Sequence, residues 1–253
     1  PLVRQRERKN AVFWSPEKGW ANPHEFENFD AVIHLAGKNI SSGRWTNKLK
    51  DEIFKSRCRD TWFLSQVLMR LKQPPKTLIC ASAVGIYGEG FLAEVCQKWE
   101  EATRGIDRQK TRVLHPRFGV VLSPKGGMLK KLLPLFRLGL GAIIGSGEQY
   151  MSWVALDDVV GAISYALTTP SLEGSFNLTA PHPETNASFS KKLAKALHRP
   201  LFLRIPEKPL RFALGEMADE MLLDSTKALP EKLEKSGYNF RYPTLEEFMQ
   251  RSF

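Results

Sequence analysis

The stretch FDAVIHLAG, residues 29–37, is a short apolar run that ends in a turn. Its centre, AVIHL, is almost continuously apolar, which is typical of a strand buried on both faces of a parallel sheet. The small residues Ala36 and Gly37 follow it as a turn. We therefore interpret residues 31–35 as a buried parallel strand.

Segments with the patterns of helix and strand alternate after this strand. Apolar residues at helical spacing predict a helix over residues 48–71, and TLICA predicts a second strand at residues 77–81. A further apolar helix face and a third strand region follow at residues 92–102 and 112–122. This alternation predicts an α/β fold of the Rossmann type, with a doubly wound parallel sheet.

The second half of the chain is less regular and is interrupted by glycine-rich loops. The predicted helices lie at residues 129–138, 156–167 and 187–197, with strands at 175–178 and 201–205 and two more helices after Pro209. We expect a Rossmann body over residues 1–123. A smaller α/β lobe over residues 124–253 is expected to be partly interleaved with it.

Composition places the chain among globular proteins of a reducing compartment. Of its 253 residues 42% are hydrophobic, which is enough for a core, and the three cysteines form no C-x-x-C pair. The longest apolar region, residues 132–145, is broken by Pro134 and Arg137, so it is a poor membrane span. We expect a cytoplasmic protein that has no membrane partner.

The net charge of +10 admits anionic partners of several kinds, from nucleic acid to a small ligand. The basic residues are spread along the chain, apart from a cluster at residues 4–9, and the aromatic and basic signature of an RNA-binding sheet is missing. We therefore expect a small-molecule substrate and no nucleic acid. The five histidines show no ligand spacing, so no metal site is indicated.

Several motifs occur in the order found in one known family. FDAVIHLAG, ASAVGIYG, RFGVVLSPKGG, GSGEQYMSWVALDDVVGAI and FNLTAP resemble the extended short-chain dehydrogenase/reductases, the fold of sugar-nucleotide epimerases. More narrowly, WxxxLKDEIFKSR, GEMADEMLLDSTKALPEKL and GYNFRYPTLEEF resemble an atypical epimerase branch, some of whose members are called cell-division inhibitors. The resemblance covers essentially the whole chain, and the region from about residue 205 is specific to that branch.

The chain departs from the family's pattern at two places. The family opens with a strand, a G-x-x-G-x-x-G turn and a helix that together hold a pyrophosphate, whereas Pro1 stands near the end of the second strand. After Gly88 the family carries an acidic segment that this sequence skips. The resemblance therefore does not include the family's phosphate-binding turn.

The resemblance implies a nicotinamide cofactor, with NADP preferred over NAD. Relatives that use NAD carry an acidic residue for the ribose 2′-hydroxyl where this chain has Arg4, and a cation there suits a 2′-phosphate. A solvated basic loop is the alternative interpretation of Arg4 and its neighbours. The expected cofactor-binding residues are Arg4, Leu35, Ala36, Gly37, Ser82 and Arg117, of which residues 35–37 match the turn beneath the adenine ribose.

The catalytic groups of the family are replaced in this chain. Extended reductases use a serine and a Tyr-x-x-x-Lys pair, and those positions align with Ala83, Leu92 and Cys96. The remaining catalytic candidates are Ser82, beside the serine position, and Tyr87, at the strand end. For Tyr87 the alternative is an aromatic ring that closes the turn, and for Cys96 it is a buried packing thiol.

Other polar residues have both a binding and a structural interpretation. The candidates for contact with an anionic substrate, such as a nucleotide diphosphate, are Arg117, Lys125 and Arg137. His115 is more simply a core histidine, and Asp158 is expected to cap a helix. Asn177 and Asn186 suit either a polar ligand or a turn.

Three functions remain open. The first, which the resemblance favours, is an NADP-dependent oxidoreductase or epimerase that acts on a nucleotide sugar or another small carbonyl compound with unusual acid and base groups. The second is a non-catalytic NADP-binding regulator, linked to cell division, whose cofactor occupancy sets its conformation. The third, a nucleic-acid-binding protein, rests on charge alone. A homodimer is compatible with the fold, because such folds often pair through helices.

Overall fold

The computed structural model describes residues 2–3 and 11–253, so Arg4 lies outside the described residues. The chain divides into two compact units. The first comprises the described residues up to Ser82, with Glu94–His115 and Glu173–Ser175, and the second comprises Ala83–Ala93, Pro116–Leu172 and Phe176–Phe253. The chain enters the second unit well before residue 123, the expected boundary, and returns to the first unit twice.

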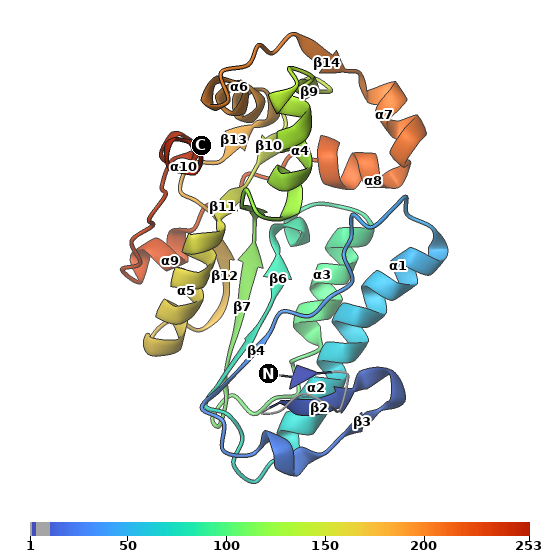
Figure 1. Ribbon diagram of the computed structural model, residues 1–253. Coiled ribbons are helices and arrows are strands. Elements are labelled where there is room, and N and C mark those ends of the chain that lie inside the picture. Colours follow the sequence, from blue (N-terminus) through green and yellow to red (C-terminus); the bar gives the residue numbers. More distant parts are fainter. Residues whose placement is uncertain (1, 4–10) are drawn as a thin grey trace. The chain divides into compact units, whose positions relative to one another are not determined.

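A five-stranded sheet carries the Rossmann-like part of the fold. Its strands are β4 (Ala31–His34), β5 (Thr77–Cys80), β6 (Ser82–Ala83), β7 (Arg112–Phe118) and β12 (Gly174–Leu178), and all of them except β5 are labelled in Figure 1. The order is β12-β7-β5-β4, with β6 paired to β7. Because β4, β5 and β7 run parallel, the predicted α/β fold with a parallel sheet is confirmed.

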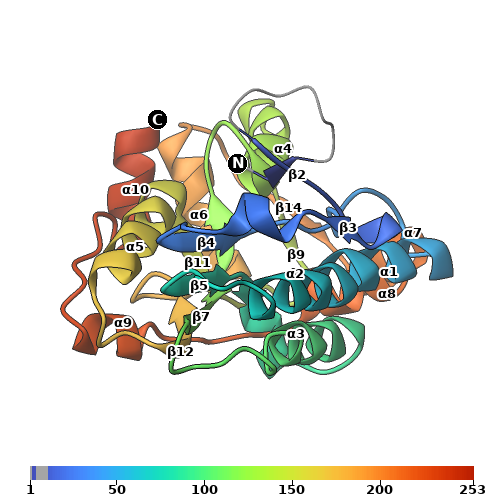
Figure 2. The same cartoon turned by 90° about the horizontal axis from the view of Figure 1, so that it is seen from below.

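The helices of the first unit form where the apolar spacing predicts them. The helix expected over residues 48–71 is one run of α1 (Asn47–Phe54), a π-helical turn η3 (Lys55–Arg59) and α2 (Asp60–Met69). Helix α3 (Phe91–Glu101) lies beside α2 in Figure 2. The indole Nε1 of Trp99 donates to Oγ1 of Thr61 at 3.0 Å, which joins these helices in the core.

A small sheet precedes β4, and only its first strand has a counterpart among the expected elements, namely the end of the family's second strand. It consists of β1 (Leu2–Val3), β2 (Val12–Ser15) and β3 (Trp20–Ala21), with short turns η1 (Pro16–Lys18) and η2 (Pro23–Phe26) on either side of β3. Trp14 of β2 is buried, and its ring centre lies 5.8 Å from that of His34. The sheet is thereby anchored to the end of β4.

The second unit contains three pairs of short strands. β8 (Val120–Leu122) runs parallel to β11 (Trp153–Ala155), β9 (Ala142–Ile144) runs parallel to β14 (Leu203–Ile205), and β10 (Tyr150–Met151) runs antiparallel to β13 (Glu184–Thr185). The strand predicted over residues 112–122 breaks at Gly119. A Cβ at Gly119 would lie 2.6 Å from the carbonyl oxygen of Ser152, so the close approach of this backbone requires glycine.

The helices of the second unit include three, at residues 127–137, 186–196 and 245–252, that contribute to its main core. From residue 127 on, the helical segments of this unit are α4 (Gly127–Arg137), α5 (Leu156–Thr168), α6 (Asn186–Ala196), α7 (Glu207–Leu214), α8 (Glu216–Ala218), the π-helical turn η5 (Asp219–Leu223), α9 (Glu231–Lys235) and α10 (Leu245–Ser252). Trp153, Phe189 and Phe248 are buried together in this core. The region after Pro209 thus holds more helical segments than the two expected, because several are only one or two turns long.

Asp158 lies in the first turn of α5, and the structure corrects its predicted role as a helix cap. The N-cap residue is Ala155, and no side chain makes a capping hydrogen bond there. The buried Asp158 carboxylate instead accepts the amides of Arg241 at 2.6 Å and Tyr242 at 3.0 Å. Asp158 therefore anchors the C-terminal segment and does not cap the helix.

Two expectations from composition concern the membrane and the cysteines. Across the described ranges, every helix is too short or too polar to cross a membrane. Cys58, Cys80 and Cys96 are all buried and free.

Candidate functional site

The loop after β4, which lies in the first unit, forms one candidate site. Residues 35–37 leave the carboxyl end of a parallel strand, which is where nucleotides bind in folds of this class. Leu35 is 53% exposed. A Cβ at Gly37 would lie 3.1 Å from Cζ of Arg57, so a side chain there would displace the guanidinium. The strand end therefore presents bare backbone at Gly37.

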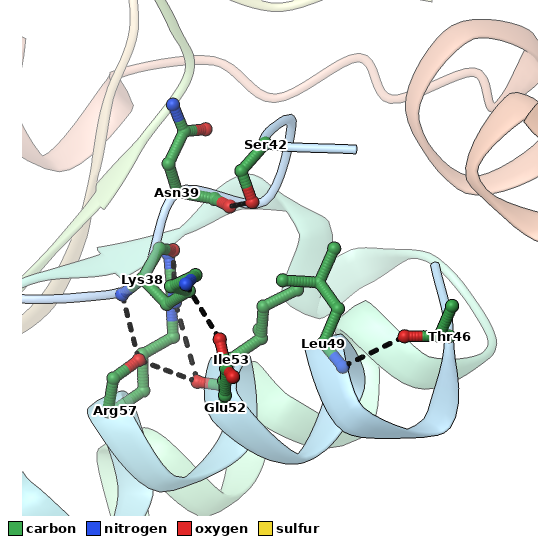
Figure 3. Close-up of polar contacts among 9 residues, drawn as sticks. Lys38, Asn39, Ser42, Thr46, Leu49, Glu52, Ile53 and Arg57 are labelled. Atoms are coloured by element: carbon green, nitrogen blue, oxygen red, sulfur yellow. Dashed lines mark hydrogen bonds and ion pairs between the residues drawn. The ribbon is translucent and has the colours of Figure 1, made fainter. Parts of the chain in front are cut away.

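Side chains of α1 and η3 hold this loop in place (Figure 3). The amide of Lys38 donates to Oγ of Ser56 at 2.8 Å, and Nη1 of Arg57 donates to the Lys38 carbonyl oxygen at 2.9 Å. The Lys38 ammonium lies 2.6 Å from a carboxylate oxygen of Glu52, and this contact lowers the pKa of Glu52. The loop is thus fixed to the helix by both its backbone and a side chain.

The remainder of the loop is closed by its own polar groups, also drawn in Figure 3. Oγ of Ser42 donates to the Asn39 carbonyl oxygen at 2.9 Å. Thr46 then caps α1, since its Oγ1 accepts the amide of Leu49 at 3.2 Å. The motif WxxxLKDEIFKSR accordingly supplies both the start of α1 and the groups that fix the strand-end loop.

Ser82, a predicted catalytic and cofactor-binding residue, is only 1% exposed in the first unit. Its Oγ donates to Oε1 of Glu100 at 2.7 Å, and Oγ of Ser175 donates to Oε2 of the same carboxylate at 2.9 Å. The hydroxyl of Ser82 is therefore oriented by Glu100. A role of Ser82 in binding or catalysis stays a prediction, and it requires this hydrogen bond to be exchanged for one to the ligand.

Tyr87, the other predicted catalytic residue, lies in the second unit and is 53% exposed. Its hydroxyl donates to Oδ1 of Asn177 at 2.8 Å and accepts from Nη1 of Arg117 at 2.8 Å. The Arg117 guanidinium also stacks on the phenol ring, with Cζ 5.2 Å from the ring centre. The structure thus brings two predicted site residues together and adds Asn177 as a second partner of the Tyr87 hydroxyl.

The hydroxyl of Tyr87 has a fixed donor and a fixed acceptor. Nδ2 of Asn177 donates to the Leu229 carbonyl oxygen at 2.9 Å, which leaves Oδ1 of Asn177 to face Tyr87. A phenol oriented in this way can exchange a proton with a substrate oxygen that replaces one of its partners. Tyr87 is also the last residue of the short turn η4 (Val84–Tyr87), and the interpretation of its ring as one that closes this turn stays a prediction.

Helix α3 carries an apolar residue and a thiol at the two positions that align with the family's tyrosine and lysine. Leu92 is half-buried, and Cys96 is 5% exposed, as expected for a packing thiol. Burial also raises the pKa of the nearby Cys58 thiol to about 12. Leu92 and Cys96 therefore do not reproduce the acid and base chemistry of a Tyr-x-x-x-Lys pair.

The other candidates divide between structural and exposed positions. His115 is buried, and its Nε2 lies 2.9 Å from Oγ1 of Thr103, which fits a core histidine. Oδ1 of Asn186 accepts the amide of Ile144 at 2.8 Å and so holds a turn. Lys125 and Arg137 are exposed. Arg4 falls outside the described residues, so the preference for NADP that it suggests stays a prediction.

Sequence reasoning did not identify three charged residues that hold the candidate residues or their segments in place: Arg57, Glu100 and Glu220. Each acts on a segment distant along the chain; Glu220, for example, binds an amide 128 residues away. Charged residues on amphipathic helices are normally assigned to the solvent face, and their long-range contacts leave no local pattern. Two usable signals existed: Arg57 ends the motif WxxxLKDEIFKSR, and Glu220 lies in the motif GEMADEMLLDSTKALPEKL.

Known proteins are similar to this chain over most of its length. Residues 205–251 match the model of a domain of unknown function, DUF1731. The chain is 44% identical over 250 residues to an epimerase family protein of Mycobacterium bovis, covering 93% of this chain and 82% of that protein. It is 38% identical over 261 residues to the epimerase family protein YfhF of Bacillus subtilis, covering 96% and 85%. The chain belongs to the epimerase family.

Solved structures agree with the assignment of this epimerase family protein. The human epimerase family protein SDR39U1, isoform 2, solved with NADPH, has a TM-score of 0.91 at 29% identity, covering 99% of this chain and 89% of that one. A nucleoside-diphosphate sugar epimerase of Corynebacterium glutamicum has a TM-score of 0.79 at 30% identity, covering 99% and 51%. A UDP-glucose 4-epimerase of Thermotoga maritima, 19% identical with a TM-score of 0.72, shares the fold. The predicted membership in the atypical extended short-chain dehydrogenase/reductases is confirmed.

Proposed function

We propose that this epimerase family protein binds NADP(H) and uses it to epimerise a carbinol centre of a nucleotide sugar. The observation that carries the proposal is the likeness to the human family member solved with NADPH, which extends over 99% of this chain at a TM-score of 0.91. The nucleoside-diphosphate sugar epimerase of Corynebacterium glutamicum, 30% identical, supports the substrate class.

The strand-end loop has the chemistry that a dinucleotide requires. Ala36 and Gly37 would hold the adenine ribose, because small residues at the end of a parallel strand let a ligand approach the backbone. The hydrogen bonds of Lys38 to Ser56 and Arg57 keep that backbone fixed before a ligand arrives. Such preorganisation lowers the entropic cost of binding. Arg4 would pair with the 2′-phosphate.

The acid and base work would fall to Tyr87. The bound cofactor would supply hydride chemistry at the carbinol carbon of the substrate. After the phenol has released its own proton to solvent, the Tyr87 phenolate would take up the hydroxyl proton of that centre as the ketone forms, and it would give that proton back as the alcohol re-forms. Arg117 and Asn177 would keep the phenol oxygen oriented, as their hydrogen bonds to it do now.

Turnover with nucleotide sugars tests this proposal. The full chain is incubated with NADP⁺ and single UDP- or dTDP-sugars, and the epimer ratio is followed by NMR. We expect Tyr87→Phe to lower the rate by about a hundredfold or more, which is the usual share of a general acid–base group, and to leave NADPH affinity within about twofold. Equal rates for wild type and variant would exclude Tyr87 as the proton carrier.

A cofactor-binding regulator without turnover is the second candidate function. It is favoured by Leu92 and Cys96, which stand on α3 where the family has its tyrosine and lysine. This alternative predicts saturable NADPH binding and an unchanged epimer ratio for every nucleotide sugar offered. Cofactor occupancy would then act through conformation, which limited proteolysis with and without NADPH would report.

A further inference from the structure

Arg57 lies in the π-helical turn η3, between α1 and α2. A π turn inserts an extra residue into a helix, and such turns are frequent at functional sites. Here the side chain reaches back to the loop after β4 (Figure 3): Nη1 donates to the carbonyl oxygens of Lys38 at 2.9 Å and Ile53 at 3.4 Å. The π-helical turn thus places a positively charged side chain at the carboxyl end of a parallel strand.

The guanidinium of Arg57 is half-buried among uncharged groups. It occupies the space that a side chain at Gly37 would need, and its Cζ lies 5.2 Å from the ring centre of Trp99. Burial lowers the pKa of Arg57, and the ionisable groups that act on it are the thiols of Cys58 and Cys96. Within residues 11–253 no carboxylate forms an ion pair with it. The positive charge is therefore uncompensated within the described chain.

One hydrogen-bonding edge of this guanidinium is unused within the described chain. Nη1 makes both of the hydrogen bonds that Arg57 donates within the described chain, whereas Nε and Nη2 donate to none of the described residues. The Nε and Nη2 edge is the fork whose parallel N–H groups match two oxygens of a phosphate. A partly desolvated cation with an open fork is stabilised when an anion completes it.

We propose that Arg57 binds a phosphate group of the dinucleotide at the carboxyl end of β4. This inference rests on the proposed function, because the ligand it names is NADP(H). The guanidinium contacts Gly37 and Lys38, the loop at which this class of fold places a nucleotide. The phosphate is either the pyrophosphate, which NADPH and NADH share, or the 2′-phosphate, which NADPH alone carries.

Calorimetric titration of the full chain with NADPH and NADH tests the site. The variants are Arg57→Gln, Arg57→Lys and the control Lys55→Gln, which removes a cation of the same turn that pairs with Asp51 at 2.7 Å. We expect Arg57→Gln to weaken NADPH binding by about tenfold or more. The NADPH affinity of Arg57→Lys should lie between those of Arg57→Gln and the wild type. The affinity of Lys55→Gln should stay within about twofold of the wild type. Weakening for both cofactors assigns the pyrophosphate, and weakening for NADPH alone assigns the 2′-phosphate.

Inorganic pyrophosphate is the second probe, because it separates the anion site from the proposed function. It should raise the melting temperature of the wild type and leave that of Arg57→Gln unchanged. If pyrophosphate raises the melting temperature through Arg57 but neither dinucleotide binds, the proposed function is contradicted and the anion site at Arg57 is supported. If the Arg57→Gln variant binds NADPH as tightly as the wild type, the anion site at Arg57 is contradicted and the proposed function is unaffected. If Arg57→Gln does not fold, Arg57→Lys decides, since wild-type affinity in that variant contradicts binding by the fork.

Discussion

Leu92 donates its backbone amide to Oε2 of Glu220 at 2.7 Å, and Phe91 donates to Oε1 of the same carboxylate at 2.9 Å. These amides begin α3, where a helix has no internal acceptors and its dipole favours an anion. Gly90 makes the contact possible: its φ is +84°, and a Cβ there would lie 2.6 Å from Oε1. The DUF1731 region therefore fixes the start of the helix that aligns with the family's catalytic helix.

Replacing Glu220 by Gln should destabilise the protein. The amide keeps one acceptor but turns an NH₂ group toward a backbone N–H, so we expect a loss of about 1–3 kcal/mol in the free energy of unfolding. Urea unfolding followed by circular dichroism measures it. The control is Asp219→Asn, which breaks a contact with Arg211 between half-exposed side chains and should cost less than about 1 kcal/mol. Equal losses of stability in the two variants would contradict the proposed role of Glu220 in holding the start of α3.

The pH dependence of stability should also depend on Glu220. Burial raises the pKa of this carboxyl and outweighs the amides of Leu92 and Phe91, and Glu216 raises it further. The folded state then binds a proton more tightly than the unfolded state, so stability falls as pH rises from the usual glutamate range through the raised pKa. Glu220→Gln should show a flatter profile over this window. A parallel profile for wild type and variant would count against the raised pKa.

Asp158→Asn should destabilise the attachment of the C-terminal segment. The buried carboxylate accepts two backbone amides, from Arg241 and Tyr242, and an amide side chain would present a donor to one of them. We expect a loss of about 1–3 kcal/mol, measured by thermal unfolding. Asp157→Asn is the matched control, since the 55% exposed carboxylate of Asp157 pairs with Arg241 at 3.4 Å. A loss of stability in Asp157→Asn as large as that in Asp158→Asn would refute the role of Asp158 in anchoring the C-terminal segment.

Gly37→Ala should disturb the strand-end loop through Arg57. The new methyl group would stand 3.1 Å from Cζ of the guanidinium, so this flexible side chain has to shift by a few tenths of an ångström, at a cost of about 0.5–1.5 kcal/mol when a χ angle leaves its rotamer. NADPH affinity should fall with it. Gly43→Ala, in the same loop, has no atom within 4 Å of the added Cβ and should leave both stability and affinity unchanged. Equal NADPH affinity for the two variants would speak against a role of Gly37.

The main sheet and its helices could be predicted because their signals are local. AVIHL and TLICA are continuous apolar runs, and the matching strands β4 and β5 end within one residue of the expected positions. β2 and β3 could not be predicted, since strands of two to four residues are too short to show a period of two.

The candidate site was predicted only where a motif pointed to it. Tyr87 and Arg117 come from motifs, and the structure joins them. Asp158 was assigned to a helix cap on its position alone, but two distant backbone amides compete better for its carboxylate. Arg57 and Glu220 act through contacts that exist only in the folded chain. Tertiary contacts of this kind leave no periodic signal.

Titration of the full chain with NADPH, followed by nicotinamide fluorescence and repeated with NADH, tests the central claim most directly. The account predicts saturable binding of NADPH, with NADH binding more weakly. Absence of binding for both dinucleotides would contradict it and would leave the epimerase fold of this chain without its expected cofactor.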